Sequence, residues 1–432
     1  MTLCFLVHSK NYFCRIKITV LQASIDMKKT ILLTLTLLLS VGIFTAQAQT
    51  NTDFSVKWKN GLRIQNADKS VKLKMGGRVQ YDMMFINQDS TMDNYFATAG
   101  NGAEIRRARF FMSGSIYDNI DFKLQIDFAN NALTLKDAYI NFKHIPVVGN
   151  LKVGHFKEPF GLSTLTSSKY LTMMERPVAS YLDLDRRLGL MVYNQHFDKR
   201  FTWQLGYFLP SIASNKYIGN GYHITGRLVG LPIYEDGDTY KVLHIGLGFS
   251  HGYLDNETSL FRFRPEAHLA PKYISFKVTD MKNANLANFE AAFIYNQFSI
   301  QGEYHQYSFS HNDTAHYQKT SYSTGIYYAT VSWMLTGEHR NYSKKKTAFD
   351  IVTPNHNFGK DGWGAFELAF RASHTDFNVD DLNGGVMDNY AFGLNWYLNP
   401  AVKIAANYIH TNSFSYYHGS SDIFQMRFQV AF

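Results

Sequence analysis

The 432-residue chain contains only two cysteines, Cys4 and Cys14. Both lie upstream of a segment with the features of a secretory signal peptide: two lysines after Met27, an apolar run over residues 31–44, and a small-x-small cleavage site at residues 46–48. A membrane anchor is the alternative, but the apolar run is shorter than the roughly 20 residues that span a bilayer. A mature chain without cysteine excludes disulfides, thiol nucleophiles and cysteine-based zinc sites.

These signals predict a division of the chain into three parts. We expect residues 1–26 to be an upstream extension from a misplaced start, residues 27–48 to be the signal peptide, and residues 49–432 to be one exported domain. Removing residues 1–48 takes away five basic and one acidic side chain, so the 43 basic and 35 acidic residues become 38 and 34. The net charge falls from +8 to +4, which removes the main support for a nucleic-acid-binding protein.

The chain also lacks a long apolar run after residue 48 and has only nine prolines, so it offers no spanning helix and few breaks in extended structure. What it has instead is alternation of apolar and polar side chains. In residues 424–432, apolar residues alternate with Gln425, Arg427 and Gln429. Because successive side chains of a strand point to opposite faces, one face is apolar and the other polar. A strand of this kind that ends on Phe432 is typical of the closing strand of a bacterial outer-membrane β-barrel.

The same alternation recurs along the chain, over residues 71–83, 122–128, 138–142, 366–372, 392–398 and 402–408. A two-sheet sandwich would give the same period, but the signal peptide and the terminal aromatic residue favour the barrel. At roughly 9–11 residues per tilted strand plus turns, the 384 residues after position 48 correspond to about 16 strands. The predicted fold class is all-β, a transmembrane antiparallel β-barrel in the bacterial outer membrane, in contact with lipid and lipopolysaccharide.

The connections are predicted to be of two kinds, short turns at one end of the barrel and long loops at the other. Residues 118–119 and 399–400 are expected to be short turns, whereas residues 342–361 and 376–388 are expected to be outer loops. Residues 159–187 combine Ser, Thr, Met and charged residues without sustained alternation. We expect this stretch to fold into the lumen as a constriction loop, and a surface loop is the alternative.

The sequence carries little that points to catalysis. There is no His-Glu-x-x-His motif. His305, His311 and His316 lie close to Asp313, but their spacing fits no standard metal site, and a polar outer loop accounts for them equally well. We therefore predict no catalytic residue, no metal, no cofactor and no enzymatic activity.

Several short segments resemble, in order, the signatures of the phosphate-selective porin O and P family. They are residues 104–109 (Glu-Ile-Arg-Arg-Ala-Arg), 135–139, 154–160, 165–170, 174–176, 186–189, 262–266, 335–340 and 362–368. The resemblance implies a homotrimeric outer-membrane barrel that passes phosphate-like anions by passive diffusion along a ladder of lumenal arginines and lysines. A cationic lining lowers the barrier for anions, and the planar guanidinium fork matches phosphate.

Carried over to this chain, the resemblance and the strand alternation give a set of pore-lining residues. Arg78, Arg107 and Arg109 have lumenal parity on their predicted strands, which leaves Arg106 with the wrong parity unless the strand end curls. The remaining candidates are an arginine pair two residues apart, a group on the inward loop, and an arginine that would anchor the return of that loop. The full set is Arg78, Arg107, Arg109, Arg262, Arg264, Ser167, Ser168, Lys169 and Arg187.

Two alternatives stay open. A lumenal arginine can pair with a carboxylate across the barrel instead of an anion, and the available partners are Asp82, Asp127, Asp137, Glu175 and Glu367. In addition, phosphate-selective members carry a lysine three positions before the serine pair, where this chain has Thr164. The alternative function is therefore a general porin, or a barrel with a structural or receptor role, without phosphate selectivity.

Overall fold

β-Strands make up most of what the computed structural model describes, which is residues 54–96, 98–182, 184–209, 221–414 and 417–432. The predicted upstream extension and signal peptide, residues 1–48, lie outside the described residues. The strands are β1 (Phe54–Trp58), β2 (Leu62–Asn66), β3 (Val71–Gln88), β4 (Gly102–Ile116), β5 (Ile120–Asp127), β6 (Thr134–Ile145), β7 (Gly149–Lys157), β8 (Arg186–His196), β9 (Phe201–Phe208), β10 (Tyr222–Asp236), β11 (Tyr240–Phe263), β12 (Ile274–Tyr295), β13 (Phe298–His311), β14 (Ser321–Met334), β15 (Tyr342–Ser343), β16 (Ala348–Phe349), β17 (Ala365–Val379), β18 (Leu382–Asn399), β19 (Val402–Phe414) and β20 (His418–Ala431).

Among the described residues, four short helical elements interrupt the strands: α2 (Ser90–Phe96), η1 (Ala129–Asn131), α3 (Leu162–Leu165) and η2 (Val178–Tyr181). Within the described ranges, no helix has both the length and the apolar character needed to cross a membrane.

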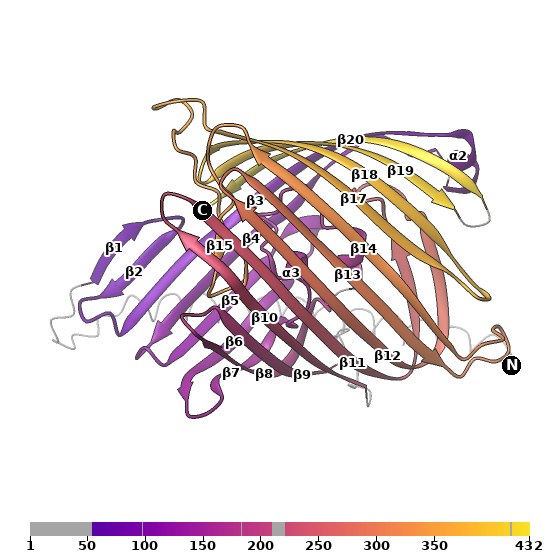
Figure 1. Ribbon diagram of the computed structural model, residues 1–432, viewed down its shortest axis with the longest axis horizontal. Coiled ribbons are helices and arrows are strands. Elements are labelled where there is room, and N and C mark those ends of the chain that lie inside the picture. The colour runs from indigo at the N-terminus through magenta and orange to yellow at the C-terminus, as the bar shows by residue number, and fades with distance from the viewer. Residues whose placement is uncertain (1–53, 97, 183, 210–220, 415–416) are drawn as a thin grey trace, which may run out of the picture. The chain divides into compact units, whose positions relative to one another are not determined.

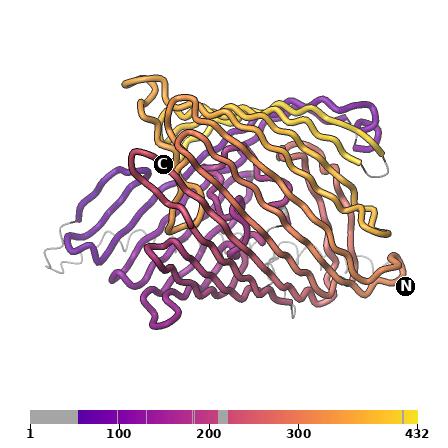
Figure 2. The backbone as a smooth tube through the Cα atoms, in the orientation of Figure 1, coloured from indigo at the N-terminus to yellow at the C-terminus, as the bar shows by residue number. Residues whose placement is uncertain are grey.

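Sixteen of the strands close into a ring. From β3 to β14 each strand pairs antiparallel with the next, β14 pairs with β17, and the series continues to β20, which pairs back with β3. The strands run side by side at a common tilt (Figure 1), and the tube in Figure 2 follows the same order. Residue 432 takes part in the closure, because the Gly77 N–H donates to the Phe432 carbonyl at 2.6 Å and the Phe432 N–H donates back at 3.1 Å. The predicted barrel of about 16 strands is confirmed.

The alternation sorts side chains as predicted. On β20, Phe424 and Phe428 are 41% and 42% exposed, whereas Arg427 between them is 2% exposed. On the neighbouring β3, Val79 is exposed and Arg78 is buried. Apolar side chains therefore cover the outside of the ring, and the polar face points inwards.

Strands β1 and β2 continue the sheet beyond the ring. β2 pairs with β3 from Lys72 to Met75, whereas β20 pairs with β3 from Arg78 onwards. The two strands thus lie beside the end of β3 at which the ring closure stops.

The connection between β14 and β17 corrects one prediction. Consecutive antiparallel strands alternate in direction, so this connection, residues 335–364, lies at the same end as the short turn between β18 and β19. The Phe358 N–H donates to the carbonyl of Leu398, next to that turn, at 2.8 Å. The expectation that residues 342–361 form an outer loop is therefore wrong. We call residues 335–364 the short-turn segment, because this long connection lies at the end of the barrel that carries the short turns.

A second expected outer loop is also wrong. Within residues 376–388, β17 continues to Val379 and β18 begins at Leu382, so only a tight turn separates them. The register between the two strands shifts once, between Asp376 and Asn378, which accommodates the local polar residues without a loop.

The connection between β7 and β8 folds into the ring, as predicted. We call residues 158–182 the constriction segment; it contains α3 and η2. Its Leu162 N–H bonds to Glu303 of β13, and its Met174 N–H bonds to Asn407 of β19, both at 2.8 Å. Strands that far around the ring from β7 can be reached only through the interior. The helix α3 accordingly lies among the strands in Figure 1.

Candidate functional site

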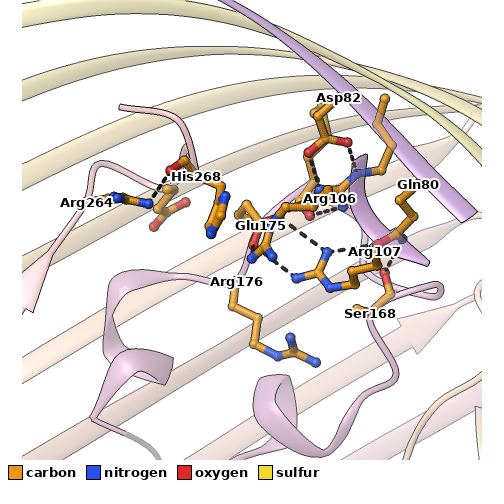
Figure 3. Close-up of polar contacts among 12 residues, drawn as sticks. Gln80, Asp82, Arg106, Arg107, Ser168, Glu175, Arg176, Arg264 and His268 are labelled. Atoms are coloured by element: carbon orange, nitrogen blue, oxygen red, sulfur yellow. Dashed lines mark hydrogen bonds and ion pairs between the residues drawn. The ribbon is translucent and has the colours of Figure 1, made fainter. Parts of the chain in front are cut away.

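A cluster of arginine and carboxylate side chains joins the constriction segment to β3, β4 and β20 (Figure 3). Arg106 donates to the two carboxylate oxygens of Glu175, from Nε at 2.9 Å and from Nη2 at 3.0 Å. Arg107 approaches Glu175 at 3.3 Å, and Arg427 donates to it at 2.7 Å. Arg427 also donates to both oxygens of Asp82, from Nε at 2.7 Å and from Nη2 at 2.6 Å. Three guanidinium groups and two carboxylates are therefore held together inside the ring.

A β-bulge explains how two consecutive arginines both face inwards. In the pairing of β3 with β4, Gln80 is opposite Arg107 and Tyr81 is opposite Ile105, so Arg106 is an extra residue without a partner position. A bulge of this kind turns one additional side chain to the same face. The parity argument that placed Arg106 on the lipid side is wrong for this reason.

Beside this cluster, Arg78 of β3 meets the two predicted serines of the constriction segment. Its Nη1 donates to Ser168 Oγ at 2.7 Å and to Ser167 Oγ at 3.2 Å. The segment's backbone is held here too, because Gln80 donates to the Ser168 carbonyl at 3.3 Å and Gln429 donates to the Lys169 carbonyl at 3.1 Å. Arg78, Ser167, Ser168 and Lys169 thus form one continuous patch.

Two other predicted arginines pair with carboxylates nearby. Arg109 Nε donates to Asp127 at 2.7 Å, across the pairing of β4 with β5. Arg187, on β8, lies 3.0 Å from Glu158, the first residue of the constriction segment. This contact places Arg187 where an anchor for the segment was predicted.

The last two predicted arginines lie apart from the cluster. Arg262 is exposed on β11 on the same side as the exposed Leu260, whereas Phe263 next to it is buried. Arg264 follows β11 and donates to the backbone carbonyl of His268 within the connection to β12. The structure therefore does not bring Arg262 together with Arg78 and Arg107.

The open alternative of structural ion pairing is confirmed for all five carboxylates. Asp82 pairs with Arg427, Asp127 with Arg109, Asp137 with Lys123 and Arg186, Glu175 with Arg106, Arg107 and Arg427, and Glu367 with Arg340. These pairs occupy donors of the lumenal cations, so a lumenal position does not by itself leave an arginine free to bind an anion.

A cavity of about 720 Å³ lies between the constriction segment, the short-turn segment and strands β3 to β9. We call it the basic chamber. Its lining has two acidic residues, Asp121 and Asp137, against ten basic ones. The basic residues are Arg63, Lys74, Arg78, Lys123, Lys152, Lys157, Lys169, Arg186, Lys345 and Lys346.

Most of these cations have no carboxylate to neutralise them. Lys123 and Arg186 share Asp137, and Lys346 pairs with Asp350. The other seven form no ion pair with any carboxylate among the described residues. Basic side chains in the chamber therefore outnumber the carboxylates that could neutralise them.

Aromatic rings hold some of these cations in place. Lys152 Nζ lies 4.9, 5.2 and 5.2 Å from the ring centres of Tyr139, Phe156 and Tyr193. Lys169 Nζ lies 5.1 Å from the ring centre of Tyr170. Cation–π contacts position an ammonium group while leaving its charge uncancelled.

Sequence reasoning missed most lysines of the chamber. The signal for Lys74 was available, since it shares a strand face with Arg78. Lys345 and Lys346 belong to a run of three lysines that was assigned to an outer loop. These lysines line the lumen because the short-turn segment lies at the short-turn end of the barrel and not at the outer end.

One pattern in the sequence resembles a hydrolase motif but lies in a different structural setting. Residues 248–252 match Gly-x-Ser-x-Gly, which in hydrolases forms a strand-to-helix turn. Here they lie inside β11, and Ser250 Oγ is buried 2.8 Å from Thr225 Oγ1. An extended strand does not present the serine as a nucleophile.

Lys169 has an unusual proton affinity. Burial, together with the positive charges of Arg78, Lys74 and Lys346, lowers the pKa of Lys169 to about 7. Because a lysine is charged below its pKa, Lys169 gains its charge as the pH falls through neutrality.

We expect acidification from pH 8 to pH 6 to raise the preference of the pore for chloride over potassium. Lys169 changes over this range from about one-tenth to about nine-tenths charged, which adds a cation to the chamber. The measurement is the reversal potential in potassium chloride gradients, since chloride does not itself titrate. In Lys169→Gln the same shift should shrink markedly. An equal shift in this variant would assign the pH dependence to another group.

Comparisons with known proteins agree with the ring. The family model described as phosphate-selective porin O and P matches residues 73–432. Porin O of Pseudomonas aeruginosa is 28% identical over 417 residues, which cover 87% of this chain and 91% of that protein.

Two solved structures share the fold. An anion-selective porin from Comamonas acidovorans has a TM-score of 0.52 at 12% identity, covering 84% of this chain and 100% of that one. OmpT of Vibrio cholerae in its trimer form has a TM-score of 0.52 at 8% identity, covering 83% and 99%. Porins are channels, and the predicted location in the bacterial outer membrane is confirmed. The chain belongs to the phosphate-selective porin O and P family of outer-membrane porins.

Proposed function

We propose that this porin passes small inorganic anions, with phosphate-like anions favoured, by passive diffusion. The observation that carries the proposal is the basic chamber, in which ten basic side chains face two acidic ones. A pore lined by one sign of charge lowers the barrier for the opposite sign and raises it for its own. The uncancelled lysines act on anions without binding them tightly enough to stop conduction.

The preference for phosphate rests on the patch at the constriction segment. There the hydroxyls of Ser167 and Ser168 both lie within hydrogen-bond distance of the guanidinium of Arg78. This combination offers several donors to a tetrahedral oxyanion. Lys157 donates to the carbonyl of Thr164, so a cation stands beside the position at which phosphate-selective members carry lysine. The family description and the similarity to Porin O point in the same direction.

The proposal extends to the surroundings of the barrel. Exposed aromatic residues such as Phe392, Phe424 and Trp333 suit contact with lipid or lipopolysaccharide. A homotrimer is the proposed assembly, in keeping with the trimer form of OmpT. A general porin, or a structural or receptor barrel without phosphate selectivity, is the competing function.

Single-channel recording in planar bilayers tests the proposal. In a potassium chloride gradient we expect a reversal potential on the anion side, and added phosphate should reduce the chloride current because it dwells at the Arg78 patch. Lys74→Gln combined with Lys345→Gln should lower the anion preference several-fold, as two uncancelled charges leave the chamber.

Lys282→Gln is the matched control, because this lysine is exposed on β12 and does not line the chamber. It should leave the reversal potential unchanged. A silent or cation-preferring channel would count against the anion pathway and in favour of the structural or receptor alternative.

A further inference from the structure

Three guanidinium groups from the barrel wall converge on a single carboxylate of the constriction segment. Glu175 accepts from Arg106 through both oxygens, lies 3.3 Å from Arg107, and accepts from Arg427 at 2.7 Å. Its side chain is 4% exposed, and those of Arg107 and Arg427 are equally buried. The arrangement is what a site for an oxyanion requires, namely several forked donors aimed at one point.

The backbone around Glu175 is held without the help of its side chain. The Met174 N–H donates to Asn407 Oδ1 at 2.8 Å, and the Met174 carbonyl accepts from Arg427. The Glu175 carbonyl accepts from Arg371 at 2.9 Å. A structural tether therefore already exists at this point of the segment, and the carboxylate adds charge rather than a missing attachment.

The charge balance of the cluster leaves room for an anion. Arg106, Arg107 and Arg427 contribute three positive charges, while Glu175 and Asp82 contribute two negative ones. Burial alone would raise the pKa of Glu175, but the positive charges of the three arginines bring it well below the ordinary value. Glu175 is therefore ionised throughout the neutral pH range.

We propose that Glu175 is a built-in competitor for anions: its carboxylate occupies an oxyanion site made by Arg106, Arg107 and Arg427. The ligand class of this site is a tetrahedral divalent oxyanion such as sulfate or hydrogen phosphate. By filling the site, Glu175 keeps a permeating anion from being trapped there, and it thereby sets the affinity of the constriction. The inference rests on the proposed function, because anions must reach the constriction to compete.

Glu175→Gln tests this directly, with sulfate as the probe. Glutamine has nearly the same shape but no charge, so the three arginines keep only Asp82 as an internal counter-ion and bind sulfate more readily. The thermal unfolding midpoint of the purified full-length protein should then rise with sulfate concentration, since a ligand that binds only the folded state stabilises it. Sulfate block of the chloride current should tighten about tenfold or more relative to the wild type.

Glu303→Gln is the matched control. Glu303 also holds the constriction segment from a fully buried position, but its partners are backbone, tyrosine, asparagine and histidine groups rather than arginines. This variant should not gain a dependence on sulfate. If Glu175→Gln binds sulfate no more tightly than the wild type in either measurement, Glu175 is only a structural counter-ion and the proposal fails.

The two readouts separate this inference from the proposed function. Sulfate-dependent stability of Glu175→Gln in a channel without anion preference would uphold the site and reject the anion pathway. Should Glu175→Gln not fold in chloride, refolding in sulfate replaces the titration. Recovery of folded protein would support the site. Glu175→Asp places its carboxylate one methylene further from the arginines and should compete less well, so failure to recover together with a wild-type sulfate response of Glu175→Asp would overturn it.

Discussion

Replacing Glu303 by leucine is expected to release the constriction segment from the barrel wall and to raise the single-channel conductance. The Glu303 carboxylate, on β13, accepts from the N–H groups of Leu162 and Ser163 at 2.8 and 2.7 Å, and from the Tyr328 hydroxyl at 2.6 Å. The two N–H groups belong to the first turn of α3, where no intrahelical acceptor exists for them. One carboxylate thus satisfies donors that the segment cannot satisfy alone.

The size of the effect on stability and conductance depends on the hydrogen-bond donors that lose their acceptor in Glu303→Leu. Each buried donor without an acceptor costs about 1–3 kcal/mol, and leucine leaves three of them. The segment can avoid this cost by leaving the wall, which exposes the donors to water and widens the pore. Conductance in planar bilayers and the thermal unfolding midpoint are the two measurements, and the first should rise as the second falls.

Two further variants test whether the effect depends on the lost carboxylate. Glu303→Gln keeps one acceptor oxygen and should show a smaller change in both measurements. Ser299→Ala removes a hydroxyl on the same face of β13 that bonds to Ser332 of β14 at 2.8 Å rather than to the constriction segment, and it should leave the conductance unchanged. A conductance increase of equal size in Ser299→Ala would mean that any loss on this strand opens the pore.

The sequence was sufficient where strand parity alone decides the outcome. Arg78 and Arg427 face the lumen because β3 and β20 run without a bulge at those positions, so a period of two places every second side chain inside. Asp82, which pairs with Arg427, could be named in advance for the same reason, since it lies on the polar face of β3.

The prediction of side-chain direction from strand parity was wrong where the register between strands shifts. One extra residue in β4 turns Arg106 inwards. In β11 the register shifts between Tyr253 and Ser259, so that Ser250 and Phe263, of opposite parity, are both buried and Arg262 is exposed. A bulge depends on pairing with the neighbouring strand, and a single strand's sequence carries no periodic signal for it.

The short-turn segment could not be placed because its end of the barrel depends on counting every strand before it. A polar stretch between two strands looks the same at either end of a barrel. Its hairpin enters the lumen through contacts with distant strands, such as the bond from Tyr342 N–H to the Tyr240 hydroxyl at 2.9 Å. Contacts between residues about a hundred positions apart leave no local pattern in the sequence.

The second large effect is expected at the pair that holds this segment. Arg227 of β10 and Glu290 of β12 are fully buried, and Arg227 Nε lies 2.6 Å from the carboxylate. The same guanidinium donates to the Thr347 hydroxyl at 2.8 Å and to the Thr347 carbonyl at 3.2 Å. Arg227→Met therefore removes the arginine partner of a buried carboxylate, which is left with His244 at 3.3 Å, and the tether of the hairpin that carries Lys345 and Lys346.

We expect Arg227→Met to destabilise the barrel by about 3–5 kcal/mol, the usual cost of leaving one member of a buried ion pair alone. We also expect the preference for anions to fall, because the hairpin with its two lysines leaves the basic chamber. Thermal unfolding in detergent measures the first effect, and the reversal potential in a potassium chloride gradient measures the second.

The double variant Arg227→Met with Glu290→Leu separates the two effects. Removing both charges takes away the isolated carboxylate, so most of the stability should return, as replacement of buried ion pairs by apolar residues is often neutral. The tether to Thr347 is still missing, so the anion preference should stay low. If stability and anion preference recover together, the hairpin is held by contacts other than Arg227, and its lysines stay in the chamber without this tether.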